Sequence, residues 1–114
     1  MVRSKNEMNT ELREHMRDGN GTVSVTHLVE KDDLHNCRLM AKIELPIGAS
    51  IGPHTHHGET EYYIILEGEG IVTEAEGETA VGAGDVVITG NGESHSIRNA
   101  GTHPLFMVAV IITS

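Results

Sequence analysis

Short runs of β-forming residues, separated by glycine-rich turns, make up the chain from Thr22 onward. Turns such as Glu67-Gly68 and Gly90-Asn91-Gly92 contain the residues that most readily supply positive φ angles. Evenly spaced short strands without a long helical pattern predict an antiparallel sandwich or barrel. The expected strands are Val23–Val29, Cys37–Leu45, Glu61–Leu66, Gly70–Ala75, Glu78–Val81, Val86–Thr89, His95–Arg98 and Leu105–Thr113.

The first 20 residues have a different character from the rest of the chain. Thr10 can cap a short helix over residues 11–17, which would end at Gly19. The whole chain has 114 residues, the size of one domain. We therefore expect an N-terminal extension over residues 1–20 and one barrel domain over residues 21–114.

Negative charge dominates the sequence and narrows the classes of partner. The net charge is −9, and no lysine or arginine occurs between Lys42 and Arg98. Such a surface repels phosphate backbones and anionic membranes, so we expect neither nucleic acid nor membrane as a partner. The one cysteine cannot form an intrachain disulfide, and the N-terminal residues lack the apolar region of a secretory signal. These features predict a cytoplasmic protein.

Metal-ligand residues gather in the stretch GASIGPHTHHGETEYYIILEG, residues 48–68. His54 and His56 are two residues apart, so on a strand their side chains point to the same side and can chelate one ion. Glu61 follows five residues after His56, and a turn through Gly58 can bring it back beside them. Glu59 is an alternative carboxylate ligand at this point. Imidazole and carboxylate ligands favour Mn, Fe, Co, Ni, Cu or Zn over Ca or Mg.

A second stretch, GDVVITGNGESHSIRN over residues 84–99, supplies His95 just after a glycine-rich turn. Two strands that each present histidine past such a turn could place those side chains opposite each other inside a barrel. His95 is therefore a candidate to complete the set.

The spacing in both stretches resembles that of the cupin family. The second stretch departs from the family pattern at one turn position, where Gly90 replaces proline. The corresponding positions are Gly48, His54, His56, Glu61 and Gly68 in the first stretch, and Gly84, Gly90 in place of proline, Gly92, His95 and Asn99 in the second.

The chain is most similar to the small single-domain bacterial members of that family. The resemblance implies an all-β fold, the double-stranded β-helix or jelly-roll cupin barrel, here with a short N-terminal extension. It further implies one divalent transition metal ion held by His54, His56, Glu61 and His95.

The resemblance leaves the reaction open, because cupins include both enzymes and binding proteins. One hypothesis is a metal-dependent enzyme, of oxygenase or isomerase/lyase type, that acts on a small oxygenated organic substrate. The alternative is a non-catalytic module that binds or senses a carbohydrate or metabolite, and a weaker reading is a metal reservoir. His57 and Glu59 could transfer protons or contact a small-molecule ligand, although a solvated loop pair is the interpretation we favour.

Alternation along the strands predicts which side chains face inward. If Glu61 points into the barrel, Tyr63 and Ile65 do so too, while Tyr62 and Ile64 face outward. The last strand, Leu105–Thr113, lacks a polar side. We expect it to be buried on both sides or covered at a subunit contact, and the protein to be a homodimer.

Overall fold

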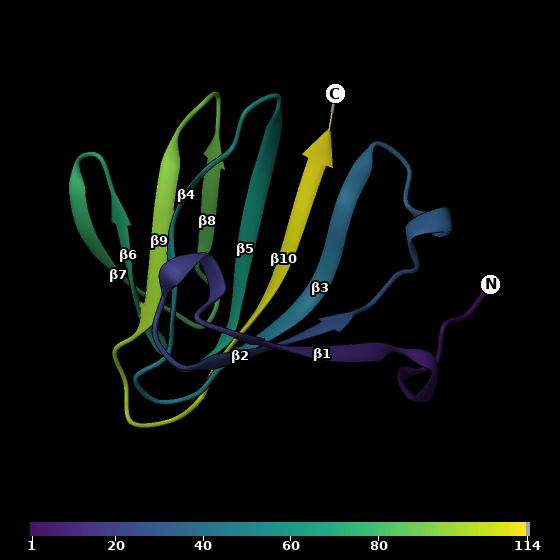
Figure 1. Ribbon diagram of the computed structural model, residues 1–114, viewed down its shortest axis with the longest axis horizontal. Coiled ribbons are helices and arrows are strands. Elements are labelled where there is room, and N and C mark those ends of the chain that lie inside the picture. Colours follow the sequence, from purple (N-terminus) through teal and green to yellow (C-terminus); the bar gives the residue numbers. More distant parts are fainter. Residues whose placement is uncertain (114) are drawn as a thin grey trace.

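The structure is a computed structural model that describes residues 1–113 and consists almost entirely of strands (Figure 1). Three 3₁₀ turns, η1 (Lys5–Glu7), η2 (Met16–Asp18) and η3 (Lys31–Asp33), lie in the first third of the chain. The all-β barrel predicted from the sequence is confirmed. The last residue of the predicted barrel domain, Ser114, lies outside the described residues. The strands are β1 (Asn9–Glu14), β2 (Thr22–His27), β3 (Cys37–Leu45), β4 (Ser50–Thr55), β5 (Glu59–Glu67), β6 (Glu69–Glu74), β7 (Gly77–Gly82), β8 (Val86–Gly90), β9 (Ser94–Asn99) and β10 (Leu105–Thr113).

Two antiparallel sheets form the walls of the barrel. The larger has the order β1-β2-β3-β10-β5-β8 and the smaller β4-β9-β6-β7. Figure 1 shows β3, β10, β5 and β8 side by side, with β1 and β2 running away from the barrel toward the N-terminus. No helix among residues 1–113 is long and apolar enough to cross a membrane.

Period-two alternation places the hydrophobic core between the sheets. In β10, Leu105, Met107, Ala109 and Ile111 are buried, whereas the residues between them are not. Aliphatic side chains from both sheets fill the interior, as expected for a chain with few aromatic residues. The core continues up to the level of Tyr63, next to the end of the barrel where the predicted ligands lie.

The helix predicted over residues 11–17 is wrong. Residues 9–14 form β1, which pairs antiparallel with β2 in continuous register from Asn9 opposite His27 to Glu14 opposite Thr22. An isolated helix of about two turns is marginal in water. The ladder to β2 pairs the backbone of the same residues along one edge, so strand pairing prevails over local preference.

After β1 the chain makes a tight turn that packs on β4. His15, Arg17 and Asp18 adopt positive φ angles of 49°, 55° and 65°. Only glycine fits where this turn meets β4, because a Cβ on Gly52 would lie 1.9 Å from the Arg17 carbonyl oxygen. Strained backbone of this kind is found most often near functional sites.

Candidate metal centre

All four predicted ligands converge at one end of the barrel interior. His54 belongs to β4, His56 follows that strand directly, Glu61 lies in β5 and His95 in β9. His54 stands opposite His95 in the β4–β9 ladder, which is the arrangement predicted from the two glycine turns. His56, Glu61 and His95 are at most 4% exposed, and His54 is half-buried.

The four donor atoms are separated by distances that suit a single small cation. Glu61 Oε1 lies 2.9 Å from the Nε2 atoms of His56 and His95 and 3.5 Å from His54 Nε2. His95 Nε2 lies 3.1 Å from His56 Nε2 and 3.0 Å from His54 Nε2. Ligands at about 2.1 Å from an ion are about 3.0–3.4 Å apart in octahedral or tetrahedral geometry. The group therefore has the donor types and spacing to hold a transition metal.

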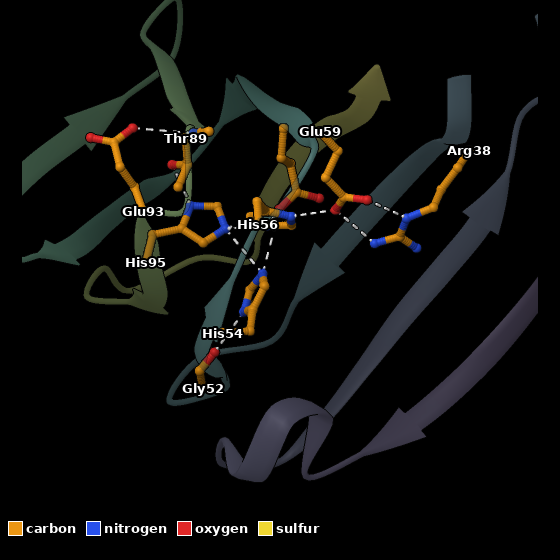
Figure 2. A network of polar contacts seen from close by, with 10 residues as sticks. Arg38, Gly52, His54, His56, Glu59, Thr89, Glu93 and His95 are labelled. Atoms are coloured by element: carbon orange, nitrogen blue, oxygen red, sulfur yellow. Dashed lines mark hydrogen bonds and ion pairs between the residues drawn. The ribbon is translucent and has the colours of Figure 1, made fainter. Parts of the chain in front are cut away.

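The outer nitrogen of each imidazole has its own partner (Figure 2). His54 Nδ1 donates to the Gly52 carbonyl oxygen at 2.9 Å, and His56 Nδ1 to the Glu59 carboxylate at 2.6 Å. His95 Nδ1 lies 2.8 Å from Thr89 Oγ1. A neutral imidazole that donates through Nδ1 keeps a lone pair on Nε2. Lone pairs then point at a common centre, where a cation would relieve their repulsion.

Glu61 and His95 are tuned toward the forms that bind a cation. Burial opposes ionisation of Glu61, but its contacts with the imidazoles of His54 and His95 lower its pKa to about 2. Burial also lowers the pKa of His95, since charge is poorly solvated there. A carboxylate and a neutral imidazole are the protonation states required of metal ligands.

Glu59 supports His56 and does not replace Glu61 as a ligand. Its carboxylate accepts from His56 and also from Arg38, whose Nε and Nη2 atoms lie 2.8 and 2.9 Å away. The hydrogen bonds from Arg38 have the largest effect on the pKa of Glu59 and lower it to about 2, although burial acts to raise it. The solvated loop pair expected from the sequence is thus wrong for Glu59, while His57 is exposed.

Arg38 and Thr89 were not identified from the sequence. Arg38 is 21 residues from Glu59, and Thr89 reaches His95 because it stands beside Glu61 in the β5–β8 ladder. Nothing in the local pattern marks either residue. The role of Glu59 could have been predicted from the sequence, since it lies only three residues after His56 and can reach its imidazole.

Gly90, the position where the family pattern has proline, is closely packed. A Cβ there would lie 2.6 Å from Thr60 Oγ1, and the Gly90 amide donates to Glu93 Oε1 at 3.2 Å. Proline could not donate this bond. The change therefore affects packing next to the site as well as the stiffness of the turn.

Tyr63 borders the centre. The Tyr63 ring stacks on His95, with centroids 4.9 Å apart and an angle of 10° between the planes. Burial and then the charge of Glu61 raise the pKa of Tyr63 well above its usual range, whereas the positive charge of Arg17 opposes this. Arg17 lies in the strained turn that packs on β4, so this turn brings a cation within electrostatic reach of the interior.

Apart from Tyr63, the interior formed by residues 1–113 offers no further acid or base. Among residues 1–113, the buried polar side chains other than the centre are Thr89 and Asn99, and Asn99 is bonded to the Leu45 and His103 carbonyl oxygens. On the inner side of the larger sheet, Glu61 in β5 pairs with Ile111 in β10, which in turn pairs with Leu39 in β3. The centre is therefore bordered by apolar side chains in that direction.

Comparison with known proteins gives consistent matches over nearly the whole chain. A family model described as "Cupin domain" matches residues 41–111. An "Oxalate-binding protein" of Thermotoga maritima is 45% identical over 113 residues, which cover 98% of this chain and 93% of that protein. A solved structure from the same organism, described as a predicted oxalate decarboxylase, superposes with a TM-score of 0.94 at 43% identity, with all of both chains covered.

A more distant structure shares the fold alone. A cupin-superfamily sugar phosphate isomerase from Silicibacter pomeroyi has a TM-score of 0.80 at 17% identity, covering 100% of this chain and 76% of the other.

Proposed function

The chain belongs to the cupin family, and we propose that it binds one divalent transition metal ion through His54, His56, Glu61 and His95 and, on that ion, a small dicarboxylate of the oxalate class. The convergence of three imidazole nitrogens and one carboxylate oxygen carries the proposal. Mn, Fe, Co, Ni, Cu and Zn all accept these ligands.

Oxalate fits the coordination positions that the four protein ligands would leave open on the ion. Four protein donors leave about two positions on an octahedral ion. Oxalate offers one oxygen from each of two directly bonded carboxylates, so it can fill two adjacent positions together. With the carboxylate of Glu61 as the one charged ligand, a divalent ion keeps a net positive charge that attracts a dianion, although the chain as a whole carries −9.

Binding without turnover is the better supported of the two functions predicted from the sequence. Enzymes that move protons need an acid or base within hydrogen-bond reach of the reacting group. Glu59 is engaged by Arg38 and His56, and His57 is exposed. Neither residue is free inside the barrel to act on a bound ligand.

Metal content and ligand titration test the proposal in two separate steps. Purified protein is analysed for bound metal, and His56→Ala is compared with His103→Ala, which removes an exposed imidazole outside the centre. We expect the first change to abolish stoichiometric metal binding and the second to leave it intact. Unchanged metal content in His56→Ala would show that the ligand assignment is wrong.

Calorimetric titration then addresses the organic ligand. Oxalate is expected to bind the metal-loaded protein more tightly than malonate, whose chelate ring is larger, and far more tightly than acetate. Equal oxalate binding to metal-free protein would refute the dependence on the ion. Conversion of oxalate to carbon dioxide and formate would instead establish an enzyme, which is the alternative suggested by the name of the solved relative.

A further inference from the structure

His54 is held differently from the other two histidines of the centre. The outer nitrogens of His56 and His95 are bonded to side chains, whereas His54 Nδ1 donates to the backbone carbonyl oxygen of Gly52 at 2.9 Å (Figure 2). His54 is also the least buried of the four ligands. The orientation of its imidazole therefore depends on where the backbone of β4 places the Gly52 carbonyl oxygen.

The sheet alone supports this carbonyl weakly. β4 lies at one edge of the smaller sheet, and among the described strands its one hydrogen-bonded neighbour is β9. The register between β4 and β9 shifts between Ile51 and His54, and Pro53 within this gap has no amide hydrogen to donate. Gly52, which holds His54, therefore lies where the ladder is interrupted.

The turn over residues 15–21 packs on β4 at this point and bonds to it. The Ser50 amide donates to the Asn20 carbonyl oxygen at 2.9 Å, and the Asn20 amide donates to Ser50 Oγ at 2.8 Å. Met16 anchors the turn to the barrel by packing against the hydrophobic core. The turn thus gives β4 a second neighbour next to the interruption in its ladder.

The contact between the turn and the strand is made by backbone against backbone. A Cβ on Gly52 would lie 1.9 Å from the Arg17 carbonyl oxygen, and a Cβ on Gly19 would lie 2.2 Å from the Ser50 carbonyl oxygen. Glycine on both sides is what permits so close an approach. Because no side chain separates the two segments, a shift of the turn also shifts the Gly52 carbonyl oxygen.

The turn has a defined conformation that its own hydrogen bonds maintain. His15, Arg17 and Asp18 have φ angles of 49°, 55° and 65°, in a region where residues other than glycine are uncommon. The His15 amide donates to the Gly21 carbonyl oxygen at 2.9 Å, and His15 Nδ1 donates to that of Gly19 at 3.1 Å. Backbone strain of this kind persists where the surrounding contacts fix it.

We propose that residues 15–21 form a clamp that positions His54 for metal binding, by fixing the Gly52 carbonyl oxygen to which His54 Nδ1 donates. This proposal rests on the proposed metal centre. The residues of the clamp are positioning residues, because they act through His54 and do not touch the ion. A segment that carries none of the four ligands is thereby part of the working centre.

Gly19→Ala loosens the clamp without changing any residue of the centre. Gly19 has a φ of −78°, which alanine adopts without strain, so the substitution acts through the added Cβ and its clash with Ser50. Gly68→Ala is the matched control at the far end of β5 from the centre. Its Cβ would lie 2.6 Å from the Pro104 carbonyl oxygen, and its φ of 92° adds strain, so the control is destabilised as well.

Competition with a chromophoric chelator gives the metal affinity of each variant. We expect Gly19→Ala to bind metal at least about 10-fold more weakly than the wild type, the lower end of the range for residues that orient metal ligands. Gly68→Ala is expected to stay within about twofold of the wild type, although it unfolds at a lower temperature. The comparison separates positioning of His54 from general stability.

Nitrogen-edited NMR of the imidazole rings tests the positioning in metal-free protein. In the wild type, the His54 Nδ1 proton is expected to exchange slowly with water, because it is bonded to Gly52. In Gly19→Ala this proton should exchange rapidly. The corresponding proton of His56, which is held by Glu59, should be unaffected. The His54 signal is assigned by its absence in His54→Ala.

Each outcome supports or overturns the clamp. A wild type that binds no metal would refute the metal centre and the clamp together. With a metal-binding wild type, the clamp alone is overturned by unchanged affinity in Gly19→Ala, by an equal loss in Gly68→Ala, or by an unchanged His54 proton. If Gly19→Ala does not fold, Ser50→Ala replaces it, because it removes the Oγ that accepts from Asn20. A smaller loss of affinity is then expected, and no loss would again overturn the clamp.

Discussion

Replacement of Glu59 by glutamine removes the charge that orients His56 while preserving the shape of the side chain. The His56 Nδ1–Glu59 contact of 2.6 Å is charge-assisted, since the pKa of Glu59 is about 2. Arg38 loses its partner but is largely in contact with water, so its loss costs little stability. Glu59→Gln should therefore act mainly on the metal centre.

The size of the effect follows from the two kinds of hydrogen bond. Bonds to charged groups contribute about 1.5–3 kcal/mol and neutral ones about 0.5–1.5 kcal/mol. The difference of about 1–1.5 kcal/mol corresponds to about a 5- to 15-fold weaker metal affinity. This agrees with the lower part of the about 10- to 100-fold range typical of residues that orient metal ligands.

Competition with a chromophoric chelator measures this affinity directly. Glu67→Gln, at the exposed end of β5 far from Glu61, is the matched control because it removes the same charge away from the centre. Affinities of the two variants within twofold of each other would refute the orienting role of Glu59. Thermal unfolding of the metal-free variants separates an effect on the centre from a general loss of stability.

Three further outcomes are expected. Metal should be released on acidification near or below about pH 5–6, because protons compete for imidazoles whose free pKa is about 6.5. Burial lowers the pKa of His95 and so moves metal release to lower pH. Full metal occupancy at pH 4 in a metal analysis would contradict this prediction. Thr89→Val should weaken metal binding in the same chelator assay by leaving His95 Nδ1 without its 2.8 Å partner, and Thr89→Ser should restore it. Gly52→Ala should destabilise the fold by about 1–3 kcal/mol in chemical denaturation, since its Cβ would meet the Arg17 carbonyl oxygen; Gly82→Ala, whose Cβ would have a normal 3.8 Å contact, is the control.

The strands of the barrel were largely predictable because their pattern is local. The bounds of β3 and β10 agree with the sequence prediction, and Tyr63 and Ile65 face inward as alternation from Glu61 required. The separate strand β4 was missed, although the spacing of His54 and His56 had been interpreted as that of a strand. Pro53 and the glycines around it mask β4 in a search for β-forming residues.

Much of the candidate centre was predictable for a different reason. Few functions other than metal binding need this set of residues at this spacing: two histidines two residues apart, a nearby glutamate and a third histidine after a similar turn. Their convergence was predicted and is present in the structure, while their occupation by a metal remains a proposal. The two candidate carboxylates were distinguished only in three dimensions, where Glu61 points at the three Nε2 atoms and Glu59 at Arg38.

The sequence by itself therefore determined the all-β class, most strand positions and the donor atoms of the centre, because each depends on residue type and short spacing. Only the tertiary structure decided that residues 9–14 form a strand, that Thr89 and Arg38 support the ligands, and which apolar side chains remain uncovered. These features depend on register between strands far apart in the chain, and a shift of one residue would exchange the inner and outer side chains. The acidic barrel with its apolar outer side is thus a product of pairing as much as of composition.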